Sequence, residues 1–374
     1  MDIYVVLPGD TVDQIAGKFS VSPESIIWNN QLVFPYPLAV GQALLIGEFS
    51  GEEEQRKLDA GGYAYTYISN WVLRQTIPYL NRLFVFSYGF TEEGEVVYPP
   101  RDDEWMVRIA REAGSLPVLT LTPLGPDGMF NNNLIHQVVT EETRTNRLLN
   151  ELVGIMKEKR YGGIDIDFEY ILAQDRDYFT AFVEQTAEIM HENGFVVTVA
   201  LAPKTSADQK GLLYEGKDYG ALARAADEVL LMTYEWGYKY GPPMAVAPLN
   251  MVRRVVDYAV TEIEPGKINL GIPNYGYDWP LPFVRGETQA RTIGNVEAVQ
   301  IAINYGAEIQ FDEMARSPYF YYTDEEGTEH VVWFEDVRSL QEKYNLLPEY
   351  GLKGIGVWQI MRWFRAMWLL GTSV

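Results

Sequence analysis

The chain has 374 residues, of which 47% are hydrophobic and 22% are charged, and its formal net charge is −22. The apolar content suffices for a packed core and excludes a disordered chain, while the length suits one large domain and a smaller one. The acidic balance argues against nucleic acid as a partner, since that needs a basic surface, and gives no attraction to anionic membranes. There is no cysteine, and three isolated histidines have no metal-ligand spacing, so we expect no metal and no cofactor.

Residues 1–48 have the pattern of a small β-α-α-β unit. A short apolar strand begins at Ile3, and a turn at residues 8–10 leads to a helix that Thr11 caps, with Gln14 three residues later. Ser22 and Pro23 begin a second helix, and residues 41–46 form the closing strand. The thin core of this unit is predicted to consist mainly of Ile3, Val5, Ile15, Ile26 and Leu44.

Residues 49–57 are polar and are predicted to be a linker, and from residue 58 to residue 374 strands and helices alternate. The expected strands are 60–67, 82–87, 117–122, 163–169, 196–202, 228–234, 268–273 and 354–359, and helices such as 144–160, 176–193 and 249–261 fit between them. Alternation predicts parallel βα units, and eight repeats fit a (β/α)8 TIM barrel, an α/β fold with its active site at the C-terminal ends of the strands.

The interval between the seventh and eighth strands is too long for one helix. Residues 283–336 contain a helix candidate at 295–305 and two candidate antiparallel strands at 317–323 and 330–334. We therefore expect a small α+β insertion there, forming one wall of a cleft.

Three carboxylates occupy every second position of the fourth expected strand, namely Asp165, Asp167 and Glu169. Strand side chains alternate between faces, so the three share one face, which must point into a polar cavity because unpaired charges are not buried. Crowded like charges raise at least one pKa, and a Glu with a raised pKa at the strand's end can act as a general acid near neutral pH. The alternatives are a face paired with Lys or Arg, or a divalent-ion site.

This strand resembles the active-site strand of glycoside hydrolase family 18, whose signature is D-G-x-D-x-D-x-E, although Gly162 stands where the family usually has its first Asp. The resemblance implies that Glu169 is the general acid and base. It also implies that Asp167 orients the substrate's N-acetyl group and tunes the acid, with Asp165 as a buried supporting carboxylate. The family's chemistry is substrate-assisted: the sugar's own acetamido oxygen attacks the anomeric carbon, with net retention.

The segment Met232-Thr233-Tyr234-Glu235-Trp236 resembles the family's M-x-Y-D motif at the end of the sixth strand. It implies that Tyr234 holds the acetamide and that Glu235, where the family commonly has Asp, binds the sugar at the cleavage site. Trp358 matches the Trp that forms the floor under the distorted sugar. Weaker predictions for substrate contact, also taken from strand ends, are Tyr275, Tyr277, Tyr67 and Tyr88.

The first 48 residues resemble a LysM module, through Tyr4-x-Val6-x-x-Gly9-Asp10-Thr11, Asn29-Asn30 and Gly41-Gln42-x-Leu44. The resemblance implies weak binding of N-acetylglucosamine polymers in a groove between the loop after the first strand and the loop after the second helix. The residues expected to line that groove are Gly9, Asp10, Thr11, Trp28, Asn29 and Asn30.

Across the whole chain, this module and the strand-end motifs together resemble the spore cortex-lytic N-acetylglucosaminidases of endospore-forming bacteria. The resemblance implies hydrolysis of β-1,4 bonds after N-acetylglucosamine in peptidoglycan, in spore cortex or its fragments during germination. A chitinase would use the same chemistry on an unbranched polymer. A carbohydrate-binding protein without activity is the alternative of another class, but such relatives typically lose the terminal Glu, which is present here as Glu169.

The sequence gives no sign of a membrane span, because no apolar run reaches 18 residues. The first residues also lack the basic region and the long apolar region of a signal peptide. Export is then unconventional, or the chain is a processed form. The missing signal peptide is compatible with a protein placed on the spore by the mother cell, and the resemblance to cortex-lytic enzymes implies association with the spore or the cell wall.

Overall fold

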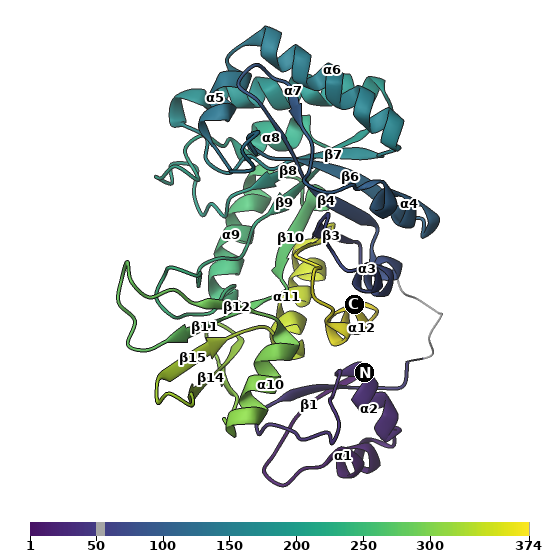
Figure 1. The fold of residues 1–374 in the computed structure, drawn as a ribbon, viewed down its shortest axis with the longest axis vertical. Coiled ribbons are helices and arrows are strands. Elements are labelled where there is room, and N and C mark those ends of the chain that lie inside the picture. Colours follow the sequence, from purple (N-terminus) through teal and green to yellow (C-terminus); the bar gives the residue numbers. More distant parts are fainter. Residues whose placement is uncertain (50–56, 374) are drawn as a thin grey trace.

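Eight parallel strands close into a barrel in the computed structural model, which describes residues 1–49 and 57–373 (Figure 1). The barrel strands in chain order are β3 (Ala60–Tyr65), β4 (Arg82–Phe90), β6 (Leu116–Leu121), β7 (Gly163–Ile166), β8 (Val196–Leu201), β9 (Glu228–Leu231), β10 (Ile268–Pro273) and β16 (Gly354–Trp358). Each pairs with its neighbour in parallel register, and β3 pairs with both β4 and β16. The predicted (β/α)8 architecture is confirmed. Residues 50–56 of the predicted linker lie outside the described residues.

Helices cover the outside of this barrel, and the short strand β5 (Val96–Val97) pairs with the end of β4. The helices are α3 (Asn70–Thr76), α4 (Glu104–Glu112), α5 (Asn133–Val139), α6 (Glu142–Lys159), α7 (Arg176–Glu192), α8 (Tyr219–Ala225), α9 (Leu249–Glu262), α11 (Val337–Tyr350) and α12 (Arg365–Gly371). The apolar face of β7 packs under them, with Ile164 and Ile166 fully buried in the same core as Leu152 of α6 and Phe182 of α7. This packing turns the opposite, acidic face of β7 toward the inside of the barrel.

Several barrel strands end earlier than the sequence pattern predicts. Strand β7 ends at Ile166 rather than at residue 169, β9 at Leu231 rather than at 234, and β3 at Tyr65 rather than at 67. After β9, the N–H of Thr233 donates to the carbonyl of Leu231 at 2.8 Å. This local hydrogen bond replaces a bond to a neighbouring strand, so the strand ends. The alternation of side chains indicates which residues face inward, but not where neighbouring strands diverge.

The expected α+β insertion follows the seventh barrel strand. It contains a five-stranded antiparallel sheet and α10 (Asn295–Tyr305). The sheet has the order β12 (Arg291–Ile293), β11 (Gly276–Pro280), β15 (Glu329–Trp333), β14 (Ser317–Thr323), β13 (Gln310–Asp312). The insertion was expected to begin at residue 283, but residues 276–280 already form β11 of this sheet, so it begins earlier. Gly276 permits the change of sheet, because a Cβ there would lie 2.3 Å from the carbonyl oxygen of Trp333.

The N-terminal unit has the predicted β-α-α-β order: β1 (Asp2–Val5), α1 (Val12–Phe19), α2 (Pro23–Asn29) and β2 (Ala43–Ile46). Thr11 and Gln14 form the expected capping box. Its core contains Val6, Val12, Ile15, Ala16, Ile26, Leu44 and Ile46. The prediction was wrong for Ile3, which packs against the barrel core, and for Val5, whose place is taken by Val6. Adjacent strand residues face opposite sides of the sheet, so an error of one position assigns each residue of the first strand to the wrong core.

The second face of the β1–β2 sheet docks on the barrel. Leu45 of β2 is fully buried in the barrel core, whereas its neighbour Leu44 is buried in the core of the N-terminal unit. Polar contacts reinforce the docking: the side chain of Gln31 accepts from the N–H of Arg365 at 2.6 Å, and the N–H of Ile309 donates to the carbonyl of Val40 at 2.9 Å. Figure 1 shows the unit beside α10 and α12.

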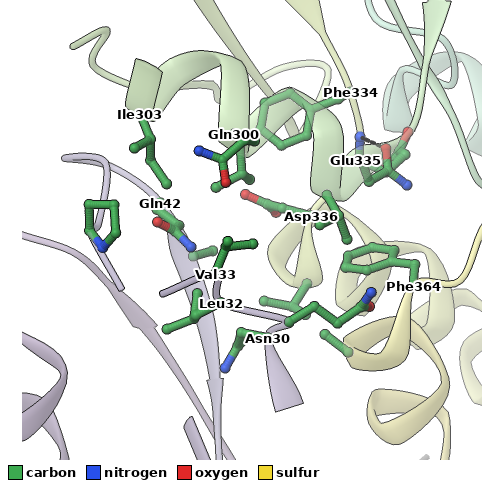
Figure 2. Close-up of a pocket in the computed structure, with 18 residues that line it drawn as sticks. Asn30, Leu32, Val33, Gln42, Gln300, Ile303, Phe334, Glu335, Asp336 and Phe364 are labelled. Atoms are coloured by element: carbon green, nitrogen blue, oxygen red, sulfur yellow. Dashed lines mark hydrogen bonds between the residues drawn. The ribbon is translucent and has the colours of Figure 1, made fainter. Parts of the chain in front are cut away.

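A hollow of about 580 Å³ remains between this unit and the insertion (Figure 2). Its two acidic side chains already have partners. Glu335 accepts from Lys343 at 2.8 Å, and Asp336 accepts from Arg338 at 2.6 Å. We therefore interpret the hollow as part of the docking interface.

Candidate active site

A cleft with a volume of about 250 Å³ opens at the C-terminal ends of the barrel strands. Its lining residues are Tyr65, Phe86, Thr122, Pro123, Phe130, Asn132, Asp167, Glu169, Tyr170 and Trp358. Asp167 is 8% exposed, and Glu169 is partly exposed to the cleft. The structure therefore brings two of the predicted carboxyls to an open groove large enough for sugar rings.

Asp165 lies deeper in the barrel and is completely buried. Tyr63 of β3 donates a hydrogen bond to its Oδ2 at 3.0 Å, and Thr198 of β8 donates to its Oδ1 at 2.6 Å. Burial raises the pKa of Asp165 to about 6, although both hydrogen bonds act in the opposite direction. Asp165 thus holds neighbouring strands together beneath the cleft and has no access to a substrate.

Asp167 and Glu169 are electrostatically coupled. Burial raises the pKa of Asp167 well above its ordinary range, and the charges of Glu169 and Asp165 raise it further. Burial also raises the pKa of Glu169, while the nearby Lys217 acts to lower both values. Because the charge of one carboxylate disfavours ionisation of its neighbour, the pair keeps its last proton to a higher pH than an isolated carboxyl would. A proton held at the rim of a cleft is what general acid catalysis requires.

Tyr234 lies beside this pair. Burial raises the pKa of its hydroxyl, and the charges of Asp167 and Glu169 are the next causes, so the hydroxyl is close to both and stays protonated. The next residue, Glu235, has a positive φ of 68°, and its carboxylate accepts hydrogen bonds from Tyr275 at 2.5 Å and Tyr277 at 2.9 Å. The two tyrosines are only 4% and 6% exposed. They therefore fix Glu235 and offer little surface to a sugar.

Aromatic rings form the other side of the cleft. Trp358, at the end of β16, contacts Phe86 edge-on with ring centroids 4.9 Å apart and lies 5.7 Å from Tyr63. Tyr67 is 51% exposed and stacks on Tyr65, with centroids 5.1 Å apart. Rings of this kind present apolar faces to a sugar, and neighbouring aromatic side chains keep Trp358 in place.

The prediction for Tyr88 was wrong. Its side chain is fully buried on the outside of the barrel, where its hydroxyl donates to Asp103 at 2.5 Å. The pairing of β4 with β6 shifts register between Val85 and Tyr88, so one residue is left over and the following side chains change face. Phe86 consequently lines the cleft where Tyr88 was expected.

In the N-terminal unit, the expected glycan-binding residues are already engaged in holding the fold. Asp10 accepts from the hydroxyl of Tyr4 at 2.7 Å and from the N–H of Leu7 at 2.8 Å, and Thr11 caps α1. Gly9 has a φ of 86° in the turn before it. The amide groups of the other pair bond to backbone atoms: Asn29 to the carbonyl of Gly47, and Asn30 to Ile26 and Leu45. Trp28 is 66% exposed, but the guanidinium of Arg365 lies 5.0 Å above its ring.

Sequence reasoning missed Tyr63, Tyr65, Phe86 and Lys217. The two tyrosines share an alternating pattern with Tyr67, and this pattern does not indicate which of the three lies level with the acid. The shifted register of β4 concealed Phe86, and a lysine in a long loop carries no sequence signal. Within residues 1–49 and 57–373, no group of three or more His, Asp or Glu side chains is arranged to hold a metal ion. No helix of that part is long and apolar enough to cross a bilayer.

Comparison with known proteins agrees with this geometry. The model of "Glycosyl hydrolases family 18" matches residues 127–362, and the model of the LysM domain matches residues 4–47. The chain is 38% identical to the cortical fragment-lytic enzyme of Bacillus subtilis (strain 168), over 99% of this chain and 97% of that protein. It is 33% identical to the putative sporulation-specific glycosylase YdhD of the same strain, over 98% and 86%. The solved structure of the Bacillus cereus spore cortex-lytic enzyme SleL is similar, with a TM-score of 0.92 at 29% identity over 99% and 97% of the two chains.

Proposed function

Because the chain belongs to glycosyl hydrolase family 18 and carries a LysM domain, we propose that it hydrolyses β-1,4 bonds on the reducing side of N-acetylglucosamine in peptidoglycan, with retention. The observation that carries this proposal is the placement of two carboxyls with raised pKa values, Asp167 and Glu169, at an open cleft walled by aromatic rings. The choice of peptidoglycan rests on relatives that match nearly the whole chain and are cortical fragment-lytic enzymes.

In the proposed first step, the carbonyl oxygen of the substrate's own acetamido group forms a bond to the anomeric carbon. The bond from that carbon to the leaving oxygen breaks, and Glu169 transfers its proton to this oxygen. Asp167 and the hydroxyl of Tyr234 hold the acetamide in position, which converts attack by a flexible group into attack by an aligned one. Glu169 then takes a proton from a water molecule, whose oxygen forms a bond to the anomeric carbon while the bond from that carbon to the acetamido oxygen breaks. The acetamide is restored, and the second inversion returns the original configuration.

Trp358 is the floor under the reacting sugar in this scheme, and Tyr65 and Tyr67 extend the apolar wall. Glu235 accepts a hydrogen bond from a sugar hydroxyl while its own position is fixed by Tyr275 and Tyr277. The LysM domain binds N-acetylglucosamine polymers in this proposal, and the enzyme is associated with the spore or the cell wall, where it hydrolyses fragments of cortex peptidoglycan during germination. The names of the cortical fragment-lytic and sporulation-specific relatives support this location.

The test compares cortex muropeptides with chitin oligomers and identifies each new reducing end by mass spectrometry. We expect muropeptide products that end in N-acetylglucosamine, and Glu169→Gln abolishes their formation while glycan binding persists. Cleavage of chitin oligomers alone would instead identify a chitinase. Full turnover by the Glu169→Gln variant would exclude the assigned acid, and binding without turnover by the unsubstituted protein would indicate a carbohydrate-binding protein.

The role of the LysM domain has a separate test. Phe34 lies in the loop after α2 and is 80% exposed, so its ring is free to stack on a sugar. Phe34→Ala should reduce retention on insoluble cortex and leave the hydrolysis of soluble fragments unchanged. Equal losses on both substrates would contradict a separate anchoring role.

A further inference from the structure

A lysine is buried beside the catalytic carboxyls, and the chemistry described above makes no use of it. Lys217 is 0% exposed and lies in the loop that connects β8 to α8. Its ammonium nitrogen has no hydrogen-bond partner among the described residues, and neither has Oδ1 of Asp167. Two buried polar atoms of opposite charge are thus left unpaired in the same region.

The loop fixes the position of Lys217 on both sides. The preceding residue, Gly216, is pressed against the chain that follows the catalytic strand, since a Cβ there would lie 2.4 Å from the carbonyl oxygen of Ile171. The following residue, Asp218, caps α8 through the N–H of Ala221 and accepts from Arg176 of α7 at 2.7 Å. Between these two attachments, the side chain of Lys217 is enclosed next to the end of β7.

Another buried lysine shows how an ordinary structural ion pair looks in this protein. Lys343 is also 0% exposed, and its ammonium donates to Glu335 at 2.8 Å. Lys217 has no such bond, and burial lowers its pKa to about 8 even though the charges of Glu169 and Asp167 oppose this. A buried ammonium without a hydrogen bond destabilises the folded protein. The negative charges of the active site are what offsets this cost.

We propose that Lys217 is a positioning residue whose positive charge stabilises the carboxylate that Glu169 becomes when it gives up its proton. This inference rests on the proposed function of Glu169. Proton transfer to the leaving oxygen creates a negative charge in a nearly enclosed site that already contains Asp167. A fixed cation beneath both groups offsets that charge, and it needs no bond to either, because Coulomb attraction in a poorly hydrated site acts over several ångströms.

Several other titratable groups face the same cluster. Tyr63 and Tyr65 contribute from β3, Asp165 from β7, and Tyr234 and Glu235 from the chain after β9. All of these are neutral or negative, so they cannot replace the charge of Lys217. The other lysine nearby, Lys204, bonds to the backbone carbonyls of Lys217 and Ala207 at 3.0 and 3.3 Å.

The experiment measures kcat/KM against pH on a soluble N-acetylglucosamine oligomer for the unsubstituted protein and Lys217→Met. Loss of the cation raises the pKa of Glu169, so the limb at high pH should move upward by about one unit, and kcat should fall more than KM changes. Lys210→Met is the matched control, because it removes a lysine of the same loop that is exposed and donates to Glu215 at 3.0 Å. We expect its profile to keep the original limbs. Equal profiles for all three proteins would overturn the proposal.

A second measurement separates this inference from the proposed function, since it needs no turnover. The carboxyl carbon of Glu169 is followed by 13C NMR during a pH titration, with its signal assigned by its loss in Glu169→Gln. Lys217→Gln, which keeps a polar side chain, serves as the neutral variant if Lys217→Met does not fold. An upward shift of the Glu169 titration supports the proposal even for an inactive protein, and an unchanged titration refutes it.

Discussion

Asp165 makes the cost of the buried acidic strand measurable. Its pKa rises from an ordinary 3.8 to about 6, chiefly because of burial. The folded state thus holds a proton that the unfolded chain releases. The stability contributed by the protonated carboxyl is fully present below pH 3.8 and is lost as the pH rises through about 6. At 1.36 kcal/mol per pH unit, the total loss is about 3 kcal/mol, of which about 2 to 3 kcal/mol falls between pH 4 and pH 7.

Asp165→Asn removes this titration and keeps the size of the side chain. The free energy of unfolding of both proteins is measured by urea denaturation at pH 4 and at pH 7. Relative to the unsubstituted protein, the variant should gain about 2 to 3 kcal/mol between the two pH values. Taking this double difference cancels any cost of the substitution that does not depend on pH. The charge of Asp165 also raises the pKa of Asp167, so Asp165→Asn lowers that pKa. This second effect changes the double difference in the same direction as the first.

Asp218→Asn is the matched control, because its titration lies below the pH range compared. Although burial acts the other way, the N–H of Ala221 and the guanidinium of Arg176 hold the pKa of Asp218 below its ordinary value. Its stability contribution is present above the unfolded pKa of 3.8 and is lost only on further acidification, so it is present at both pH 4 and pH 7 and this variant should show a double difference near zero. A double difference for Asp165→Asn that equals that of the control, or that has the opposite sign to the one expected, would refute the reasoning.

Two further substitution pairs test the geometry of the strands and of the domain contact. Phe86→Ala should raise KM for glycan oligomers severalfold, because it removes a cleft wall and the edge contact to Trp358. Tyr88→Phe should change stability and leave KM unchanged. A raised KM for Tyr88→Phe together with an unchanged KM for Phe86→Ala would contradict the shifted register of β4. Gly41→Ala and Gly9→Ala both place an alanine at a φ near +80°, which costs about 1 kcal/mol, but only at Gly41 would the Cβ meet a carbonyl oxygen, at 1.8 Å. Thermal unfolding should show a clearly larger loss for Gly41→Ala, and equal losses would contradict the docked arrangement.

The sequence predicted the barrel because its signals are local and repeated. Alternation in the acidic strand correctly placed Ile164 and Ile166 in the core, and the same alternation directs Asp167 and Glu169 to the cleft. It could not reveal the register shift in β4, since an extra residue in one strand is defined only against its neighbour. The pattern of β1 had a similar limit, because both faces of the β1–β2 sheet are buried and neither is marked by polar residues.

The active site was predictable to the extent that a short motif contains it. Lys217 is brought to the cluster by the packing of a long loop against Ile171, and such a contact leaves no periodic trace in the chain. Glu235 was placed at the correct strand end, but its hydrogen bonds to Tyr275 and Tyr277 depend on where β10 stops and β11 begins.

The burial of Leu45 in the barrel core means that the LysM domain is not an independent appendage. The distance between a glycan site on this domain and the cleft is therefore set by the packed interface and not by the length of a tether. Truncating the first 48 residues would strip cover from apolar side chains of the catalytic domain. Such a truncation would combine two effects, the exposure of an apolar surface and the loss of an anchor. Point substitutions on the outer loops of the LysM domain remove the anchor without exposing that surface.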